Sequence, residues 1–359
     1  MFFEYHNDTP SFLISSFVLY FWKEKSEYSG GKMIEQKIKK LFEEVGLGNV
    51  AYPIESVSGG FLHRMYKVRA GKKTYAVKHL NPVIMKRPDA ISNFTAAEKL
   101  EKMIEDAGIP IVAALSFNNK MQEVDGDYFY IFDWHNGLTT DWYHITSDQC
   151  RQVGSILGKM HSLDLKTGIT TGIEESKIDF DLYVSKAKEM DPELFLLLAE
   201  SKELLQYAED ELNKARKLLP DIVCISDGDM DPKNVMWENG QPLVIDLECL
   251  AYGNPISDAL QLSLQWLGVT ICNIELNHIH AFFDGYLSVY DNGFHKYADV
   301  FGLGYTWLEW FEYNLKRTLD NCAGEEEKEM GVKEVKNTLA RIRCLNENEA
   351  DIRRHLALL

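Results

Sequence analysis

The β-like part of this chain is confined to one stretch, and this constrains the fold more than any other feature. From Pro53 to about residue 132, apolar and polar residues alternate in short runs that turn residues separate. One helical segment, Ile91–Ala107, interrupts the stretch, and from Asn136 onward the pattern is mainly helical. The exception is 222–250, where short β-like runs alternate with Gly-Asp, Asp-Pro and Asn-Gly breaks. The sequence therefore predicts an α+β protein with two lobes, a small one with an antiparallel β-sheet and one inserted helix, and a larger, mainly helical one.

The expected boundaries follow from these patterns. Five strands are expected in the small lobe: Ile54–Val57, Phe61–Arg69, Lys73–Leu80, Ile111–Phe117 and Tyr128–Phe132. In the second lobe, Asp181–Leu219 is expected to be one long helical stretch. We divide the chain into an extension at 1–33, a first lobe at 34–135 and a second lobe at 136–359. The extension is crowded with aromatic residues, and Met33, which opens a clean helical pattern, is a candidate for the natural start.

Composition excludes several classes of function. The chain has 359 residues and is 45% hydrophobic, enough for a large core, and it carries 38 Lys and Arg against 55 Asp and Glu. A net charge of −17 argues against a broad basic surface for nucleic acid or anionic lipid. The apolar stretch Phe12–Trp22 is too short to span a bilayer. We therefore expect no nucleic-acid partner and no membrane association, and the sequence leaves the oligomeric state open.

The cysteines are scattered. There are six, with no CxxC pair and no histidine at metal-ligand spacing, which argues against a zinc site and against a disulfide framework. This usage is typical of a reducing compartment, so we expect a cytoplasmic protein.

The densest polar cluster lies at 226–237, and an Asp closes the apolar run that follows it. Asp229, Asn234 five residues later and Asp246 would supply a carboxylate base and hard oxygen ligands for Mg²⁺. The alternative is that Asp227, Asp229 and Asp231 are turn residues that bind local backbone groups.

A lysine and a glycine turn in the first lobe add to this pattern. Lys78 ends the strand Thr74–Lys78, and the next helix offers Glu98, Glu101 and Glu105 as partners for a buried ammonium group. Ser58, Gly59 and Gly60 form a turn whose backbone N–H groups could approach phosphate oxygens. Taken alone, Lys78 fits an exposed strand position, and the glycine turn fits an ordinary hairpin.

The order of these motifs resembles the aminoglycoside phosphotransferase and choline kinase group of the protein-kinase-like fold. Two further segments strengthen the resemblance: 158–163 (Gly-Lys-Met-His-Ser-Leu) is similar to a helix end of that group, and 252–258 (Tyr-Gly-Asn-Pro-Ile-Ser-Asp) to the segment after its metal-binding aspartate. The resemblance covers about residues 35–320. It implies a nucleotide-binding N-terminal lobe and a C-terminal lobe that carries catalysis and acceptor binding.

The resemblance also implies a role for individual residues. Asp229 would be the catalytic base, and Asn234 and Asp246 would bind Mg²⁺. The nucleotide would be held by the glycine turn, by Lys78 paired with Glu98, and by the backbone carbonyl of Asp133 and the N–H of His135, which would bind adenine; these residues are Ser58, Gly59, Gly60, Lys78, Glu98, Asp133 and His135. His161 and Asp258 would be structural supports.

The function implied is an ATP- and Mg²⁺-dependent kinase that phosphorylates a hydroxyl group of a small molecule, with GTP as the alternative nucleotide. A pseudokinase that binds nucleotide without turnover is the alternative function, because Asp227 stands where the group usually has a histidine and could repel Asp229. The segment 304–320, with Trp307 and Glu309, would suit a cationic or sugar-like acceptor, but its helical spacing equally fits core packing.

Overall fold

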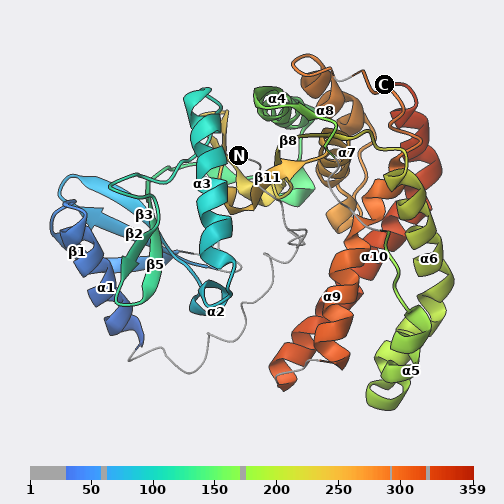
Figure 1. The fold of residues 1–359 in the computed structure, drawn as a ribbon, viewed down its shortest axis with the longest axis horizontal. Helices are drawn as coiled ribbons and strands as arrows, with labels where there is room; N and C mark the ends of the chain where they lie inside the picture. The colour runs from blue at the N-terminus through green and yellow to red at the C-terminus, as the bar shows by residue number, and fades with distance from the viewer. Residues whose placement is uncertain (1–29, 58–62, 170–174, 292, 321–323) are drawn as a thin grey trace. The chain divides into compact units, whose positions relative to one another are not determined.

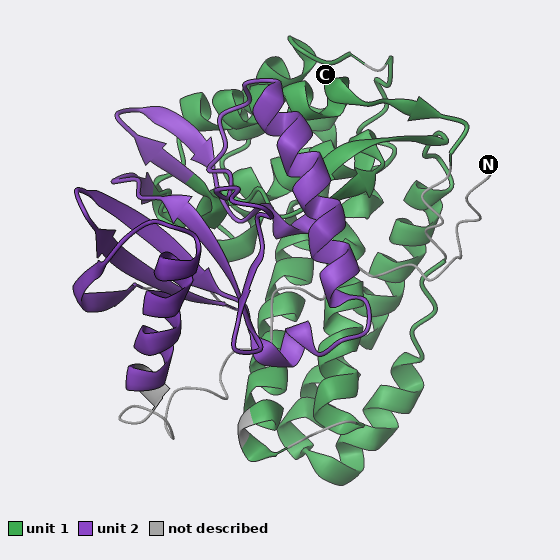
Figure 2. Cartoon of the chain, turned by 60° about the vertical axis from the view of Figure 1, so that its left-hand side comes forward, with its two compact units in different colours: residues 1–14, 139–235, 251–359 green, residues 15–138, 236–250 purple. Residues whose placement is uncertain are grey.

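The computed structural model describes residues 30–57, 63–169, 175–291, 293–320 and 324–359, and the chain forms two compact units. Of the described residues, those within 139–235 and 251–359 form unit 1, and those within 30–138 and 236–250 form unit 2 (Figure 2). Unit 2 holds the larger sheet and unit 1 holds most of the helices, so the predicted two-lobed α+β fold is confirmed.

Unit 2 is built on a five-stranded antiparallel sheet with the strand order β1-β2-β3-β5-β4 (Figure 1). Its strands are β1 (Val50–Val57), β2 (Arg64–Ala70), β3 (Lys73–His79), β4 (Gln122–Val124) and β5 (Asp127–Asp133). The helix α1 (Gly30–Glu44) buries Ile38, Leu41 and Phe42 in the same core as Val68 and Val77 of the sheet. The apolar face of α1 and the inward positions of the strands therefore close one hydrophobic core.

The predicted strand Ile111–Phe117 is wrong. This segment forms only an isolated bridge between Ile111 and Val244, and β4 takes the edge of the sheet. Its backbone N–H groups go to different acceptors: Val112 donates to the Val244 carbonyl at 2.8 Å and Leu115 to the Ile131 carbonyl at 2.7 Å. An apolar run thus satisfies its backbone without joining one ladder, which periodicity does not reveal.

The remaining elements of unit 2 come from two distant parts of the chain. Two helices, α2 (Pro82–Met85) and α3 (Ala90–Asp106), follow β3, and α3 lies close to its predicted range. Residues 236–250 return to this unit through β10 (Gln241–Val244), where the Val244 N–H donates to the Pro110 carbonyl at 2.9 Å. A second, three-stranded sheet has the order β10-β9-β6, with β9 (Val235–Glu238) and β6 (Leu138–Thr139). Residues 236–250, expected from the sequence to lie in the second lobe, thus group with the larger sheet.

Unit 1 contains the long helices α4 (Ser147–Leu163), α5 (Phe180–Met190), α6 (Pro192–Arg216), α7 (Pro255–Trp266), α8 (Asn277–Leu287), α9 (Trp307–Leu319) and α10 (Glu325–Leu356). Short 3₁₀ turns connect the elements of the chain: Trp142–His144, Pro232–Asn234, Leu247–Cys249, Val269–Ile271 and Phe301–Thr306. A small sheet has the order β11-β8-β7, with β7 (Lys166–Thr167), β8 (Ile222–Asp227) and β11 (Leu250–Gly253).

The expected helical stretch Asp181–Leu219 divides into two helices at Asp191. The Asp191 carboxylate accepts the Leu194 N–H at 3.0 Å and caps α6, and Pro192 occupies the first turn of α6. Figure 1 shows α4 and α8 side by side, and a Cβ atom on Gly154 of α4 would lie 2.1 Å from the Phe282 carbonyl of α8. Glycine at this position therefore lets the two helix backbones approach each other.

A disulfide joins Cys272 to Cys344, with their Cα atoms 5.7 Å apart. This corrects the expectation from the scattered cysteines, because 72 residues separate the two along the chain and only the fold brings them together. Cys150 and Cys224 of the described chain are buried free thiols. Among the residues that the structure describes, none of the helices is long and apolar enough to cross a membrane.

Candidate active site

Lys78 is buried near the end of β3 and is held by two carboxylates of unit 2. Its Nζ lies 2.6 Å from Oδ1 of Asp246 and 2.5 Å from Oε1 of Glu248, and the residue is 5% exposed. Both carboxylates follow β10, whose backbone is bonded to the 110–112 segment of the same unit. The fold thus brings together Lys78 and Asp246, which the sequence singled out, across 168 residues of chain.

Burial and charge act in opposite directions on this cluster. Burial alone lowers the pKa of Lys78, but the charges of Asp246 and Glu248 outweigh it and hold the pKa above its ordinary value. Burial, together with the Glu248 charge, raises the pKa of Asp246. The pKa of Glu248 is lowered, because Lys78 and His63 outweigh its burial. Two carboxylates therefore share one ammonium group.

The backbone of Asp246 is left-handed, with φ of 65°. This conformation costs conformational free energy for a residue other than glycine. Such residues cluster where the surrounding structure and the function require a particular side-chain direction. Asp246 is the residue that links β10 to the following 3₁₀ turn, so the left-handed step sets where its carboxylate lies.

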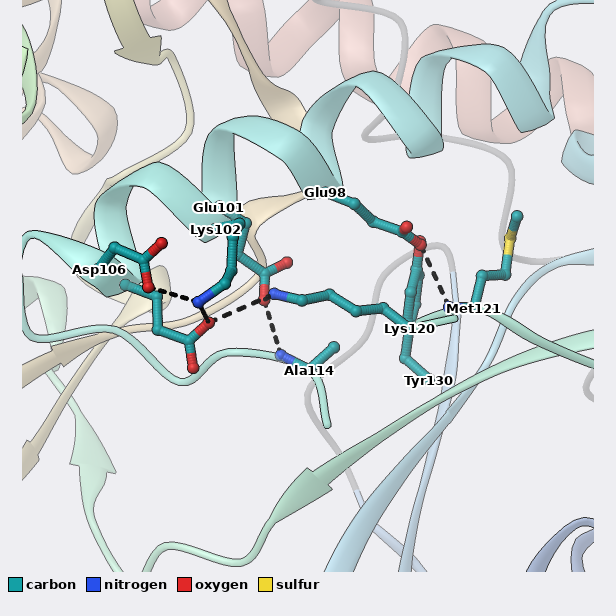
Figure 3. Close-up of polar contacts among 9 residues, drawn as sticks. Glu98, Glu101, Lys102, Asp106, Ala114, Lys120, Met121 and Tyr130 are labelled. Carbon is teal, nitrogen blue, oxygen red and sulfur yellow. Dashed lines mark hydrogen bonds and ion pairs between the residues drawn. The ribbon is translucent and has the colours of Figure 1, made fainter. Parts of the chain in front are cut away.

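The structure gives Lys78 other partners than the predicted Glu98. On α3, Oε1 of Glu98 accepts the Tyr130 hydroxyl at 2.8 Å and the Met121 N–H at 3.2 Å. The neighbouring Glu101 accepts the Ala114 N–H at 2.7 Å and pairs with Lys120 at 2.9 Å (Figure 3). Spacing along the helix could not reveal these partners, because they lie on β5 and on the segment before it. Both glutamates therefore tie α3 to its own unit.

This arrangement predicts the result of a double-mutant cycle. Glu98→Gln and Tyr130→Phe should each destabilise the protein and show a coupling free energy of about 1 kcal/mol, since they share one charged hydrogen bond. Glu98→Gln combined with Lys78→Met should show a smaller coupling. Urea unfolding of the single and double variants measures both values. If the coupling free energy between Glu98 and Lys78 were larger than that between Glu98 and Tyr130, the Lys78–Glu98 pair predicted from the sequence would be supported instead.

Asp229 lies in unit 1, in a turn that fixes its carboxylate from two sides. Oδ1 is 2.9 Å from Nζ of Lys233, and Oδ2 accepts the side-chain amide of Asn234 at 2.9 Å. The same amide donates to the Asp229 carbonyl at 2.8 Å. Lys233 also pairs with Asp231 at 2.9 Å, and both carboxylates help to raise the pKa of Lys233 against its burial. The Asp229 side chain is 23% exposed, so a carboxylate of fixed orientation remains accessible.

Two further hydrogen bonds, one of them fully buried, stabilise this turn. The Asp227 carboxylate accepts the Asp229 N–H at 3.3 Å, and the Trp266 indole donates to the Met230 carbonyl at 3.1 Å. Asp227, which stands where the resembling group usually has a histidine, thus holds the turn through the Asp229 N–H. His161 and Asp258 lie together, with Nε2 of His161 3.1 Å from Oδ2 of Asp258 and both side chains buried.

The donor set fits a divalent cation in each unit taken by itself. The structure forms no ready-made cluster of three or more His, Cys, Asp or Glu ligands in the part of the chain that it describes. In unit 2, however, the carboxylates of Asp246 and Glu248 lie side by side, both in contact with Lys78. In unit 1, the amide nitrogen of Asn234 is bonded to Asp229, which fixes the amide so that its oxygen is available as a ligand. Carboxylate and amide oxygens are the ligands that Mg²⁺ prefers.

The family model described as "Phosphotransferase enzyme family" matches residues 53–296, more than half of the chain. The chain belongs to the phosphotransferase enzyme family. The match spans Lys78, the Asp229 turn and Asp246, the residues whose geometry is described above. No curated protein sequence matches this phosphotransferase.

Solved structures of similar fold include a spectinomycin phosphotransferase in complex with ADP and spectinomycin, at 14% identity and a TM-score of 0.59, covering 87% of this chain and 98% of that one. An ethanolamine kinase of Plasmodium vivax has 14% identity and a TM-score of 0.55, with 87% and 89% covered. An amicoumacin kinase in complex with AMP-PNP, Ca²⁺ and its ligand has 12% identity and a TM-score of 0.55, with 86% and 95% covered. At these identities the likeness shows the protein-kinase-like fold.

The other predicted nucleotide-binding residues of this phosphotransferase lie in unit 2. Asp133 ends β5, and the next residue, Trp134, donates its N–H to the Thr74 carbonyl at 3.3 Å. Glu238 accepts the Asn136 N–H at 2.8 Å, and its carboxylate lies 3.1 Å from Nδ1 of His135, so these contacts fix the 133–136 segment. The glycine turn Ser58, Gly59 and Gly60 lies outside the described residues.

The sequence missed the residues that support the site. Glu248 and His63 were not singled out, yet Nε2 of His63 lies 3.4 Å from Glu248 and its Nδ1 accepts the Asn81 N–H at 2.9 Å. Glu248 follows Asp246 by two residues, so a second acidic residue after the same strand was an available signal. Lys233 had the same kind of signal, as a cation inside the acidic turn. His63 had none, because its partners are remote in sequence.

The segment proposed for a cationic acceptor is occupied by internal contacts. Trp310 is 2% exposed, in agreement with the core-packing alternative. Glu309 pairs with Arg216, and Glu312 pairs with Lys316 at 2.8 Å. The guanidinium of Arg341 already covers the Trp307 ring, 4.4 Å from its centroid. These aromatic and acidic side chains therefore have intramolecular partners.

Proposed function

We propose that this phosphotransferase is a kinase that transfers the γ-phosphoryl group of ATP, with Mg²⁺, to a hydroxyl group of a small molecule. The observation that carries the proposal is the Asp229 turn, which holds one accessible carboxylate by an amide on one side and an ammonium group on the other. Family membership supplies the class of reaction. The nucleotides bound in the spectinomycin phosphotransferase and amicoumacin kinase structures support ATP as the donor.

In this mechanism Asp229 accepts the proton of the acceptor hydroxyl as its oxygen forms a bond to the γ-phosphorus. The bond between the γ-phosphorus and the β–γ bridging oxygen breaks, and ADP leaves with that electron pair. Lys233, 2.9 Å from Oδ1 of Asp229, favours the ionised carboxylate before the transfer. Asn234 orients the other carboxylate oxygen.

Lys78 is the phosphate-binding cation of unit 2. Its ammonium group is preformed and charged, but Asp246 and Glu248 contact it directly. A cavity of about 20 Å³ beside it, lined by Glu98, Tyr130 and others, has room for about one water molecule. A phosphate oxygen therefore contacts Lys78 only when the carboxylate of Asp246 or Glu248 moves away from it. Asn234 and Asp246 would hold Mg²⁺, which neutralises phosphate charge and would also compensate the carboxylates.

The remaining assignments are proposals of the same kind. The backbone carbonyl of Asp133 and the N–H of His135 bind the adenine base, with GTP as the alternative, and the turn Ser58 to Gly60 covers the phosphates. The acceptor is a small molecule with a free hydroxyl group. The Asp229 N–H donates to the Asp227 carboxylate, and this contact supports an ordered turn and an active kinase over the pseudokinase alternative.

Nucleotide binding is the first testable consequence. ATP–Mg²⁺ at about 100 times its Kd should stabilise the protein by about 2.7 kcal/mol, which corresponds to a Tm increase of about 4 °C for a chain of this size. Differential scanning fluorimetry measures the shift, with Mg²⁺ alone as the control. Absence of a shift at saturating nucleotide would contradict both the kinase and the pseudokinase.

Phosphoryl transfer is tested by ADP release in the presence of aminoglycosides, choline-like amines and sugars. We expect one class of acceptor to increase ADP release above the rate with ATP–Mg²⁺ alone. A nucleotide-induced Tm shift without transfer to any hydroxyl compound would instead favour the pseudokinase.

A further inference from the structure

Unit 1 contains a cavity of about 280 Å³ that lies outside the residues assigned above. Its walls are the segment around the 3₁₀ turn Trp142–His144 and the loop between α7 and α8, and its lining includes Trp142, Tyr143, Ile145, Leu267, Glu275 and His278. This volume is near the lower end of the range for small-molecule pockets. It has room for a ligand of about ten non-hydrogen atoms.

Backbone hydrogen bonds within the loop between α7 and α8 fix the conformation of one wall. Gly268 has φ of 103°, and a Cβ atom there would lie 2.1 Å from the Asn273 carbonyl. The Asn273 N–H donates to the Gly268 carbonyl at 3.1 Å, and the Glu275 N–H donates to the Leu267 carbonyl at 3.1 Å. The disulfide of Cys272 anchors the same loop to α10. The wall is therefore preorganised, which lowers the entropy cost of binding a ligand.

Two polar groups of the cavity, the His278 ring and the Glu275 carboxylate, can accept hydrogen bonds from a ligand. His278 is 7% exposed, and its Nδ1 lies 3.2 Å from the Trp266 carbonyl. A carbonyl only accepts, so Nδ1 carries the proton, and burial lowers the pKa of His278, which keeps the ring neutral. Nε2 then carries a lone pair. The Glu275 carboxylate is exposed, and its negative charge acts on His278.

Aromatic side chains supply the rest of the lining chemistry. Trp142 and Tyr143 lie at the cavity, and Tyr143 is 69% exposed. Aromatic faces attract cations, and a lone pair with a carboxylate requires a ligand that donates. We propose that this cavity is a binding site for a small organic ammonium ion, a primary amine with an apolar or aromatic body, whose N–H groups bind Glu275 and His278. The net charge of −17 further favours a cation.

Hydrogen bonds connect both walls of the cavity to the Asp229 turn. Trp266, whose carbonyl binds His278, donates its indole N–H to the Met230 carbonyl at 3.1 Å. From the other wall, the Thr140 N–H donates to the Pro232 carbonyl at 3.2 Å. The lining residue His278 is thus connected to the Met230 carbonyl through two hydrogen bonds, both made by Trp266. Amine binding itself does not depend on the proposed kinase activity.

The probe is 2-phenylethylamine, which has no hydroxyl group and therefore is not a phosphoryl acceptor. Isothermal titration of the full chain at pH 7.5, without nucleotide, is compared with titration of 2-phenylethanol, the neutral molecule of similar shape. We expect the amine to bind about tenfold more tightly or better, because only it makes the charged contacts. No amine binding at millimolar concentration, or equal affinity for the two probes, would overturn the proposal.

Matched variants place the amine in this cavity. Glu275→Gln should weaken amine binding about fivefold, whereas Glu203→Gln, at an exposed position of α6, should leave it unchanged. His278→Asn keeps a nitrogen donor for the Trp266 carbonyl but removes the Nε2 acceptor, and should also weaken binding. Thermal unfolding verifies that each variant is folded. Equal affinities in the Glu275 and Glu203 variants would place the amine elsewhere and overturn the assignment.

These binding experiments use neither nucleotide nor acceptor, so their outcome is separate from that of the kinase proposal. An inactive protein that binds the amine would contradict the kinase and leave the amine site intact. An active kinase that binds no amine would contradict the amine site and leave the kinase proposal intact.

Discussion

Asp229→Asn should lower the rate of phosphoryl transfer by about 10²–10⁴-fold, the range that general-base catalysis contributes in enzymes. The asparagine preserves the shape of the side chain and a hydrogen-bond acceptor for Asn234 but does not accept the hydroxyl proton. It also removes the charge that Lys233 faces at 2.9 Å. We therefore expect the loss in kcat, with the Tm increase on addition of ATP–Mg²⁺ preserved.

Two controls separate loss of chemistry from loss of structure. Asp221→Asn changes an exposed aspartate just before β8 and should leave kcat unchanged. The unfolding free energy of Asp229→Asn should stay within about 1 kcal/mol of the original protein, because Asp229 is partly exposed and Lys233 keeps Asp231 as a partner. A variant that transfers phosphate at the original rate would exclude Asp229 as the base.

The sequence predicted what depends on local pattern and not what depends on contacts between distant segments. The alternation around β2 and β3 and the amphipathic spacing of α3 are properties of short windows, so those elements lie near their predicted ranges. The run Ile111–Phe117 has strand-like composition, but its N–H groups are divided between Val244, Ile131 and the Glu101 side chain. Nothing in the window reveals those acceptors.

The same division holds at the candidate site. Asp229 and Asn234 were found together because five residues separate them, and the turn joins them directly. The partner of Lys78 was predicted on α3 because that helix is the next element, whereas the fold supplies Asp246 and Glu248 from 168 and more residues away. Cys272 and Cys344 show the same effect in unit 1. The sequence identified which side chains could carry the chemistry, but their contact partners are determined by the tertiary structure.

Removal of the buried ammonium group gives the largest expected change in stability. Lys78→Met keeps much of the apolar stem but leaves Asp246 and Glu248 without their shared cation, and removal of one partner from a buried ion pair costs about 3–5 kcal/mol. Urea unfolding should show this loss, and the Tm increase with ATP–Mg²⁺ should disappear. Lys73→Met, at the exposed start of the same strand, should lie within about 0.5 kcal/mol of the original protein.

The double variant Lys78→Met with Glu248→Gln distinguishes lost charge compensation from poor packing. If the cost arises from uncompensated carboxylates, the second substitution should recover part of the stability, because it removes one of the two negative charges next to the site. His63, 3.4 Å from Glu248, keeps an amide oxygen as a possible acceptor in that variant. If instead the two losses simply add, the methionine fails for steric reasons, and the charge balance described for Lys78, Asp246 and Glu248 is wrong. Recovery of stability without recovery of nucleotide binding would identify Lys78 as the group that holds the nucleotide.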